Sequence, residues 1–171
     1  MPKPFMRLLN VKEKNYAGLA DLLYANLKST NCLALHGGLG AGKTSFARCF
    51  IRHHLGDTLA DVPSPTFTLA QHYPNSETNA LDVWHYDFYR IEDEKEVQEL
   101  GFDDNMEGAI SIIEWPEKIT AYLPPDTLFI QFDEAVDDSE RNLTFIGTSI
   151  WCGLRDKIKD NQELSKFLAD E

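Results

Sequence analysis

The chain has 171 residues, a length typical of one domain, and 43% of them are hydrophobic, as in an ordinary globular protein. Its formal net charge of −12 argues against independent tight binding to RNA or DNA, because such binding needs a basic face. Contact with nucleic acid through a partner protein stays open. The three cysteines have no C-x-x-C spacing, which argues against disulfides and a zinc site and favours a reducing cytoplasm. The sequence shows no signal-peptide pattern and no apolar run of about 18 residues, so we expect no membrane contact.

The first elements in chain order are a helix and a strand that lead into a glycine-rich segment. Apolar residues recur at three- and four-residue steps, which predicts an amphipathic helix over residues 13–27. An apolar run over 32–35 predicts a strand, and a second helix is expected over 45–55 with Gly56 as its C-cap. Between that strand and that helix lies the sequence G-G-L-G-A-G-K-T, residues 37–44.

This segment is a complete Walker A motif, G-x-x-x-x-G-K-[ST], in a strand–loop–helix setting. Its backbone N–H groups are expected to point into one concavity at the positive end of a helix dipole, where glycines permit close approach of phosphate. Lys43 would reach the β- and γ-phosphates, and the Thr44 hydroxyl would bind Mg²⁺. The predicted nucleotide-binding residues are Gly38, Leu39, Gly40, Ala41, Gly42, Lys43, Thr44 and Ser45. The alternative, a glycine-rich turn before a helix, does not account for the whole pattern.

The remaining chain alternates between strand and helix patterns after a break at residues 63–65. The predicted elements are a strand over 66–71, a polar turn over 74–78, a strand over 81–89, a charged helix over 93–100 ended by Gly101, a buried strand over 109–114, a helix over 116–123, an antiparallel pair of strands over 127–132 and 142–147, and an amphipathic helix over 154–168. Such alternation implies an α/β layer architecture, with nucleotide bound at the carboxyl ends of parallel strands.

Glu114 is a carboxylate at the tip of a strand that is otherwise mostly apolar. A Walker B acid occupies such a position and holds Mg²⁺ directly or through water. The alternative is an ordinary strand end that meets solvent. The isoleucines before Glu114 favour a central strand, and Trp115-Pro116 stops it at once, so we expect the metal role.

Asp87 lies on an aromatic strand, H-Y-D-F-Y-R, where it shares one face with His85 and Tyr89. A carboxylate there is costly to bury unless a metal-bound water, Lys43 or a hydroxyl group satisfies it. The alternative is a surface ion pair between Asp87 and Arg90 or another basic residue. For Arg90 itself, contact with phosphate and a purely structural role are equally compatible with the sequence. For His85 the preferred interpretation is a packed, hydrogen-bonded histidine.

Thr66 follows a proline in S-P-T-F-T, residues 64–68, and is placed like a switch residue whose hydroxyl senses the γ-phosphate and Mg²⁺. The alternative is a β-branched strand residue. Trp115 has two open interpretations, a packing residue or a sensor. The chain contains no Asn-Lys-x-Asp segment of the kind that reads guanine, so adenine is the expected base.

Four motifs, G-G-L-G-A-G-K-T-S, S-P-T-F-T-L, H-Y-D-F-Y-R and I-I-E-W-P, resemble in order and spacing the bacterial TsaE family, also called YjeE, over about residues 33–124. Its members are small ATPases needed for threonylcarbamoyladenosine modification of tRNA. The resemblance implies a single P-loop ATPase domain over residues 1–171, of the three-layer α/β P-loop NTPase class, with a mixed, largely parallel sheet flanked by helices. The catalytic residues that it implies are Lys43, Asp87, Glu114 and Thr66, with Thr44 and Glu114 at the metal.

The resemblance also implies ATP and Mg²⁺ as cofactors, a cytoplasmic location, and work with the TsaD–TsaB pair, in which TsaD transfers the threonylcarbamoyl group and tRNA is met only indirectly. Gly38 stands where the family commonly has Asp, and Ser45 replaces a common Thr. Two alternatives remain. One is a small-molecule kinase. Such kinases need an Arg-rich lid, and the scarcity of arginines after Lys118 argues against it. The other is a nucleotide-gated binding module without useful turnover.

Overall fold

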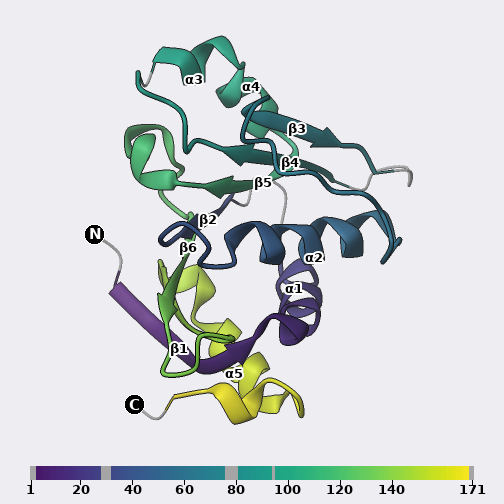
Figure 1. Ribbon diagram of the computed structural model, residues 1–171, viewed down its shortest axis with the longest axis vertical. Coiled ribbons are helices and arrows are strands. Elements are labelled where there is room, and N and C mark those ends of the chain that lie inside the picture. Colours follow the sequence, from purple (N-terminus) through teal and green to yellow (C-terminus); the bar gives the residue numbers. More distant parts are fainter. Residues whose placement is uncertain (1–2, 28–31, 76–80, 94, 170–171) are drawn as a thin grey trace.

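The computed structural model describes residues 3–27, 32–75, 81–93 and 95–169, and the strands among them form one seven-stranded sheet (Figure 1). Its order is β1-β7-β6-β2-β5-β4-β3. The strands are β1 (Lys3–Lys12), β2 (Cys32–His36), β3 (Ala70–Tyr73), β4 (Asp82–Asp87), β5 (Ala109–Glu114), β6 (Leu128–Glu134) and β7 (Glu140–Gly147). The central strands β6, β2, β5 and β4 are parallel, and antiparallel strands flank them at both edges. The expected mixed, largely parallel α/β sheet is confirmed.

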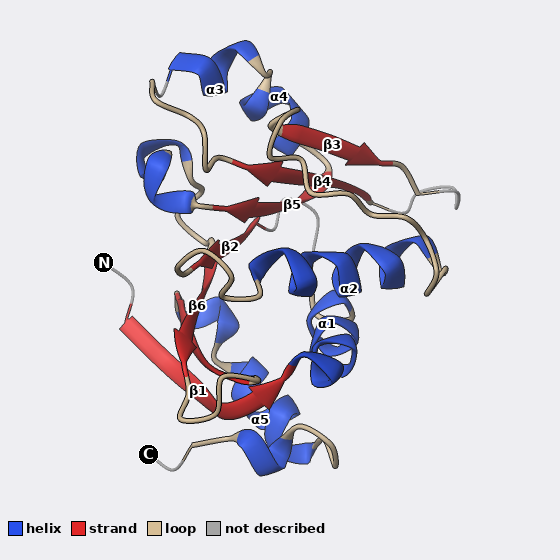
Figure 2. Ribbon diagram, in the orientation of Figure 1, coloured by secondary structure: helices blue, strands red, loops and turns tan. Residues whose placement is uncertain are grey.

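Helices cover both faces of this sheet (Figure 2). The α-helices are α1 (Tyr16–Tyr24), α2 (Lys43–Leu55), α3 (Lys95–Glu99), α4 (Phe102–Met106) and α5 (Gly153–Asp160). The 3₁₀ turns are η1 (Glu13–Asn15), η2 (Pro116–Lys118), η3 (Thr120–Tyr122), η4 (Ser149–Trp151) and η5 (Ser165–Phe167). The larger apolar core contains buried residues of α1, α2 and α5, and the smaller core contains those of α3, α4 and the segment after η2. None of the helices in the described part of the chain is long and apolar enough to cross a membrane.

The central strand β5 is buried along its whole length, and its side chains alternate between the two cores. Ile110 and Ile112 belong to the larger core, whereas Ile113 belongs to the smaller one. By the same alternation, Glu114 faces the side of the sheet on which α2 lies. Glu114 and Asp87 are register partners at the carboxyl ends of β5 and β4. The sheet therefore places these two carboxylates side by side at the edge where the P-loop lies, which is the Walker A segment of residues 37–44.

Two glycines of the P-loop are required by their surroundings. A Cβ added to Gly37 (φ +150°) would lie 2.7 Å from the Phe132 carbonyl oxygen, a distance that no side chain tolerates. Gly42 has φ +99° and directly precedes α2, with the Tyr16 hydroxyl 3.0 Å from the place of a Cβ. Nothing lies within 4 Å of a Cβ added at Gly38. The loop therefore needs glycine for its conformation at some of its glycine positions but not at Gly38.

The prediction of a strand over residues 66–71 is wrong for most of that segment. Residues 66–68 form a turn, Leu69 has φ +64°, and the strand begins only at Ala70. The backbone folds back because the Leu69 amide donates to the Pro65 carbonyl oxygen (2.6 Å) and the Asp87 amide donates to the Leu69 carbonyl oxygen (3.1 Å). Thr66 thus lies in a tight loop over the end of β4, and the alternative interpretation of Thr66 as a β-branched strand residue is wrong.

Three helix predictions need correction as well. Instead of one helix over 116–123 there are two 3₁₀ turns, separated at Ile119 (φ −136°). The helix predicted over 154–168 ends at Asp160, because the Asn161 side chain accepts hydrogen bonds from the backbone amides of Glu163 and Leu164, and only η5 follows. The helix predicted over 13–27 begins as η1 and ends at Tyr24. The turn predicted over 74–78 lies largely outside the described residues.

Strand β1 and helix α4 are absent from the sequence predictions. The apolar alternation of β1 is interrupted by a register shift between Leu8 and Val11, where Asn10 has φ +57°. Helix α4 has only five residues, and among them Phe102 alone is buried. Neither element has enough regular apolar spacing for a periodic pattern.

Candidate functional site

A cavity of about 290 Å³ opens at the carboxyl ends of the parallel strands, beside the N-terminus of α2. Its lining residues are Leu39, Gly40, Ala41, Gly42, Lys43, Thr44, Ser45, Ser64, Thr66, Asp87, Tyr89, Glu114 and Trp115. All the residues that the sequence predicts for nucleotide, metal and catalysis lie in this set except Gly38, which contributes its carbonyl oxygen to Lys43. Four motifs that are separate in the sequence therefore meet at one cavity.

Lys43 begins α2, and its ammonium group lies against the P-loop. Nζ donates to the carbonyl oxygens of Gly37 (2.7 Å) and Gly38 (2.8 Å) and lies 4.0 Å from the ring centroid of Trp115. Burial lowers the pKa of Lys43, and the Glu114 carboxylate opposes that shift. Because its direct partners are neutral groups, the charge of Lys43 remains available to an anion at the helix N-terminus.

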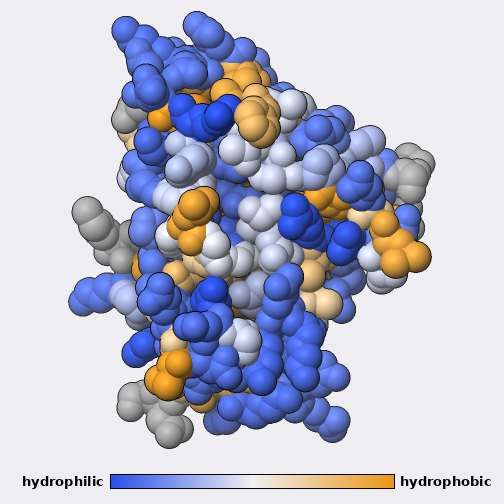
Figure 3. Space-filling view, in the orientation of Figure 1, coloured by the Kyte–Doolittle hydropathy of each residue, from blue (hydrophilic) through white to orange (hydrophobic). Residues whose placement is uncertain are grey.

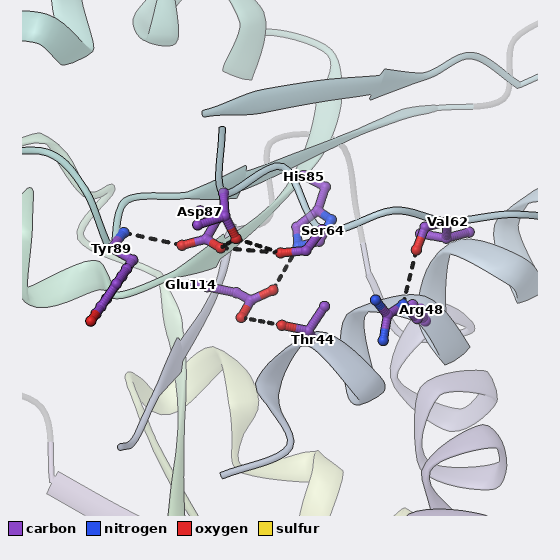
Figure 4. Close-up of polar contacts among 9 residues, drawn as sticks. Thr44, Arg48, Val62, Ser64, His85, Asp87, Tyr89 and Glu114 are labelled. Atoms are coloured by element: carbon purple, nitrogen blue, oxygen red, sulfur yellow. Dashed lines mark hydrogen bonds and ion pairs between the residues drawn. The ribbon is translucent and has the colours of Figure 1, made fainter. Parts of the chain in front are cut away.

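Glu114 is held at both of its carboxylate oxygens (Figure 4). Thr44 Oγ1 donates to Oε2 at 2.8 Å, and His85 Nε2 donates to Oε1 at 2.9 Å. The Glu114 side chain is only 2% exposed, and His85 is fully buried. The contact between the Thr44 hydroxyl and the Glu114 carboxylate joins the P-loop helix to the central strand β5 in the lining of the cavity.

The donor set at this place fits Mg²⁺. A threonine hydroxyl and a glutamate carboxylate are hard oxygen ligands, and Mg²⁺ prefers one or two such protein ligands together with phosphate and water oxygens. In the described part of the chain, no group of three or more His, Cys, Asp or Glu side chains is arranged to hold a metal ion by itself. A cation at Thr44 and Glu114 would therefore depend on the phosphate groups of a ligand.

Asp87 has a different set of partners, all of them neutral. Thr66 Oγ1 donates to Oδ2 at 2.5 Å and Ser64 Oγ at 3.2 Å, while the Tyr89 amide donates to Oδ1 at 3.0 Å. The two hydroxyl groups are also 2.8 Å from each other. The Arg90 guanidinium lies over the Phe67 ring, at 4.4 Å from its centroid. A hydroxyl pair thus satisfies the buried Asp87, as one of the predicted alternatives requires.

The loop that carries Ser64 and Thr66 is tied to α2 as well as to β4. Arg48 Nε donates to the Val62 carbonyl oxygen at 2.9 Å, just before the S-P-T segment (Figure 4). Together with the folded-back backbone at Leu69, this contact sets the path of the loop across the cavity. The position of Thr66 therefore depends on the helix that begins at the P-loop.

Trp115 covers Lys43 and is a site residue that the sequence left undecided. It has φ +60°, an uncommon conformation for a bulky residue and one that is often found at functional sites. Its ring contacts that of Tyr89, with centroids 4.9 Å apart. The tight reversal after Glu114 thus turns the indole back over the ammonium group of Lys43.

Arg141, at the start of β7, is a further residue that sequence reasoning did not place at this site. Its Nε donates to the Ala41 carbonyl oxygen and its Nη2 to the Gly40 carbonyl oxygen, both at 3.2 Å. Its Nη1 donates to the carbonyl oxygens of Asp138 and Glu140 at 2.6 Å. The guanidinium thereby joins the P-loop to the turn between β6 and β7. No motif surrounds Arg141, so only the tertiary structure reveals this contact.

Two exposed apolar side chains belong to a residue that lines the cavity and to a sequence neighbour of another lining residue. Leu39 is 82% exposed and Phe67, next to Thr66, is 81% exposed. Elsewhere the face seen in Figure 3 is largely hydrophilic, with separate apolar patches. Isolated exposed apolar residues are common on protein surfaces. Leu39 lines the cavity, so a molecule bound there would lie beside it.

Comparisons with known proteins agree with the four motifs. The family model described as threonylcarbamoyl adenosine biosynthesis protein TsaE matches residues 11–143. The tRNA threonylcarbamoyladenosine biosynthesis protein TsaE of Rickettsia felis is 37% identical over 154 residues, which cover 90% of this chain and 86% of that protein. The Bacillus subtilis protein of the same name is 39% identical over 140 residues, which cover 81% and 82%.

A solved structure gives the same likeness in three dimensions. The crystal structure of YdiB from Bacillus subtilis matches with a TM-score of 0.70 at 30% sequence identity, and the match covers 97% of each chain. The family match extends beyond residues 33–124, where the motifs lie, and includes part of β1 and of β7.

Proposed function

This chain belongs to the TsaE family of tRNA threonylcarbamoyladenosine biosynthesis, and we propose that within that process it binds and hydrolyses ATP with Mg²⁺. The observation that carries the proposal is the 2.8 Å contact between the Thr44 hydroxyl and the Glu114 carboxylate, beside Lys43 and Asp87. A phosphate-binding loop, a pair of metal ligands and a second carboxylate are the parts that phosphoryl transfer to water needs.

In the proposed complex the P-loop amides and Lys43 bind the phosphates of ATP. Lys43 exchanges the carbonyl oxygens of Gly37 and Gly38 for phosphate oxygens, which carry more negative charge. Thr44 and Glu114 would hold Mg²⁺, and the ion would supply positive charge that offsets the negative charge of the phosphates. The absence of a guanine-reading Asn-Lys-x-Asp segment from the sequence supports adenine as the base.

Asp87 and Thr66 are proposed to orient the attacking water. The Asp87 carboxylate accepts hydrogen bonds from hydroxyl groups and an amide, and it forms no ion pair among the described residues. It can therefore accept a further hydrogen bond from a water molecule near the γ-phosphate. Thr66 keeps the carboxylate in that place and brings a hydroxyl close to the same water. Asp87 can then receive the proton that the water releases on attack.

We further propose that hydrolysis is slow until the TsaD–TsaB pair binds. Among the described residues, no arginine lines the cavity, so Lys43 is its only cationic side chain. Phosphoryl transfer generally needs further positive charge at the transition state, which a partner protein can supply. The net charge of −12 supports the same arrangement, because tRNA would then be held by the partners.

The test is the rate of ATP hydrolysis by the purified chain, alone and with the TsaD–TsaB pair and tRNA. We expect slow hydrolysis alone and a clear rise with the complete set. No rise, in a chain that binds ATP, would contradict the partner-dependent role. Phosphate transfer to a small acceptor would instead identify a kinase. Full support of tRNA modification by Glu114→Ala would identify a nucleotide-gated binding module.

A further inference from the structure

We propose that His85 is a positioning residue that fixes the Glu114 carboxylate for Mg²⁺ binding; this inference rests on the proposed ATP–Mg²⁺ function. The sequence favoured a packed, hydrogen-bonded histidine at this position. The structure shows which group it bonds to. His85 Nε2 donates to Glu114 Oε1 at 2.9 Å, across two adjacent parallel strands.

The hydrogen bond lies on the side of Glu114 away from the P-loop. One carboxylate oxygen receives the Thr44 hydroxyl from α2, and the other receives the His85 imidazole from β4 (Figure 4). When a cation takes the place of the Thr44 hydrogen bond, that donor no longer orients the carboxylate. His85 can still do so, because its contact is made to the other oxygen.

Packing alone does not account for an imidazole at this position. His85 is fully buried, and its register partner on β5 is Ile112. Its Nδ1 is buried and has no hydrogen-bond partner among the described residues. An imidazole with an unsatisfied nitrogen costs more to bury than an apolar side chain of similar size. The bond to Glu114 is the contact that offsets this cost.

Without His85, the Glu114 carboxylate would be oriented only by the hydrogen bond from the Thr44 hydroxyl, and a bound cation would replace that hydrogen bond. Groups that orient metal ligands typically change metal affinity by about 10- to 100-fold when they are removed. We therefore expect His85 to act on the Mg²⁺ requirement rather than on nucleotide binding as such. The P-loop and Lys43, which would bind phosphate, do not contact His85 in any hydrogen bond or ion pair of the described residues.

The experiment compares His85→Met with His85→Gln in the full chain. Methionine fills the space without a donor, whereas the glutamine amide can place its nitrogen near the position of Nε2. Binding of a non-hydrolysable ATP analogue is followed by tryptophan fluorescence while Mg²⁺ is titrated, and again without Mg²⁺. We expect His85→Met to need at least about tenfold more Mg²⁺, and His85→Gln to stay within about threefold of the unmodified chain. Binding without Mg²⁺ should be unchanged in both.

An equal Mg²⁺ requirement in His85→Met and the unmodified chain would overturn the inference and leave the proposed function intact. An unmodified chain whose nucleotide binding ignores Mg²⁺ would instead overturn the proposed function. If His85→Met does not fold, ¹⁵N NMR of the unmodified chain decides the question. A proton on Nε2 of His85 supports the inference, and a bare Nε2 overturns it, because that nitrogen then cannot donate to Glu114.

Discussion

Asp87 and Glu114 are register partners on adjacent parallel strands, and yet each carboxylate bonds to hydroxyl groups of a different segment. Glu114 receives the hydroxyl of Thr44 in the P-loop helix, whereas Asp87 receives those of Ser64 and Thr66 in the loop before β3. The two carboxylates thus have different hydroxyl partners, and this difference supports the proposed roles of Glu114 at the cation and of Asp87 at the water. The sequence alone left their roles interchangeable.

The first prediction concerns the charge of Glu114. Glu114→Gln keeps the size of the side chain but removes the negative charge of the carboxylate that would bind Mg²⁺. ATP turnover should therefore fall by about 100-fold or more, while nucleotide binding without Mg²⁺ should persist. The matched control is Glu117→Gln, since the side chain of Glu117 is 40% exposed and lies 3.4 Å from His36. Steady-state phosphate release and nucleotide titration measure the two effects. Equal turnover in both variants would contradict the metal role.

The second prediction concerns the 2.5 Å hydrogen bond from Thr66 to Asp87. Thr66→Val is nearly isosteric but leaves Asp87 with one hydroxyl donor fewer, so we expect a loss of about 1–3 kcal/mol in the free energy of unfolding and a marked fall in turnover. Thr66→Ser keeps the hydroxyl and should retain most of both. Urea unfolding and ATP hydrolysis distinguish the variants. A fully active Thr66→Val would show that this hydroxyl has no part in the reaction.

The third prediction separates two neighbouring glycines of the P-loop. A methyl group at Gly37 would lie 2.7 Å from a backbone carbonyl oxygen, whereas one at Gly38 meets nothing within 4 Å. Gly37→Ala should therefore lower the free energy of unfolding by about 2 kcal/mol or more, and Gly38→Ala should change it by less than about 1 kcal/mol. Thermal unfolding of the two variants under identical conditions measures the difference. Similar melting temperatures would contradict the tight approach at Gly37.

The fourth prediction concerns pH. His54 donates from Nε2 to the Tyr73 carbonyl oxygen (3.0 Å) and accepts the Tyr24 hydroxyl at Nδ1 (3.1 Å), and burial lowers its pKa. In the unfolded chain the imidazole has its usual pKa of about 6.5 and takes up a proton first as the pH falls. The contribution of neutral His54 to stability is therefore present above about pH 6.5 and is lost as the pH falls from there towards the lower pKa of the folded state.

The measurement is the free energy of unfolding between roughly pH 7.5 and pH 5.5. As the pH falls, the free energy of unfolding should decrease less steeply in His54→Gln than in the unmodified chain, because the variant lacks one group that takes up a proton in the unfolded state. The matched control is His53→Gln, an adjacent histidine whose side chain is 38% exposed and lies 2.6 Å from Asp21. If the free energy of unfolding fell equally steeply in the unmodified chain and in His54→Gln, His54 would be excluded as a cause of this pH dependence.

The parts of the site that could be predicted from sequence are those with local signatures. The P-loop depends on glycine and lysine at fixed spacing between a strand and a helix, and Glu114 follows a run of apolar residues that has to be a buried strand. Asp87 and Thr66 were found by motif, but their direct contact could not be deduced. It depends on the positive φ of Leu69, which turns a β-branched segment away from strand geometry.

The parts that could not be predicted depend on contacts between distant residues. Strand β1 has a bulge that breaks its apolar alternation, so pairing with β7 defines it better than its own pattern does. His85 could be recognised as packed and hydrogen-bonded, but not as the partner of Glu114, because the register of β4 against β5 decides that contact. The C-terminal helix was overestimated because the Asn161 cap interrupts a run of apolar residues at helical spacing.

The guanidinium of Arg141, near the start of the last strand along the chain, donates hydrogen bonds to the P-loop, about 100 positions earlier in the sequence. A fragment that stopped after β6 would still contain all four recognisable motifs. It would nevertheless lose the group that fastens the outer carbonyl oxygens of the loop, together with the neighbour that β1 needs for pairing. Shortening this protein to its motifs would therefore remove part of the scaffold that shapes them.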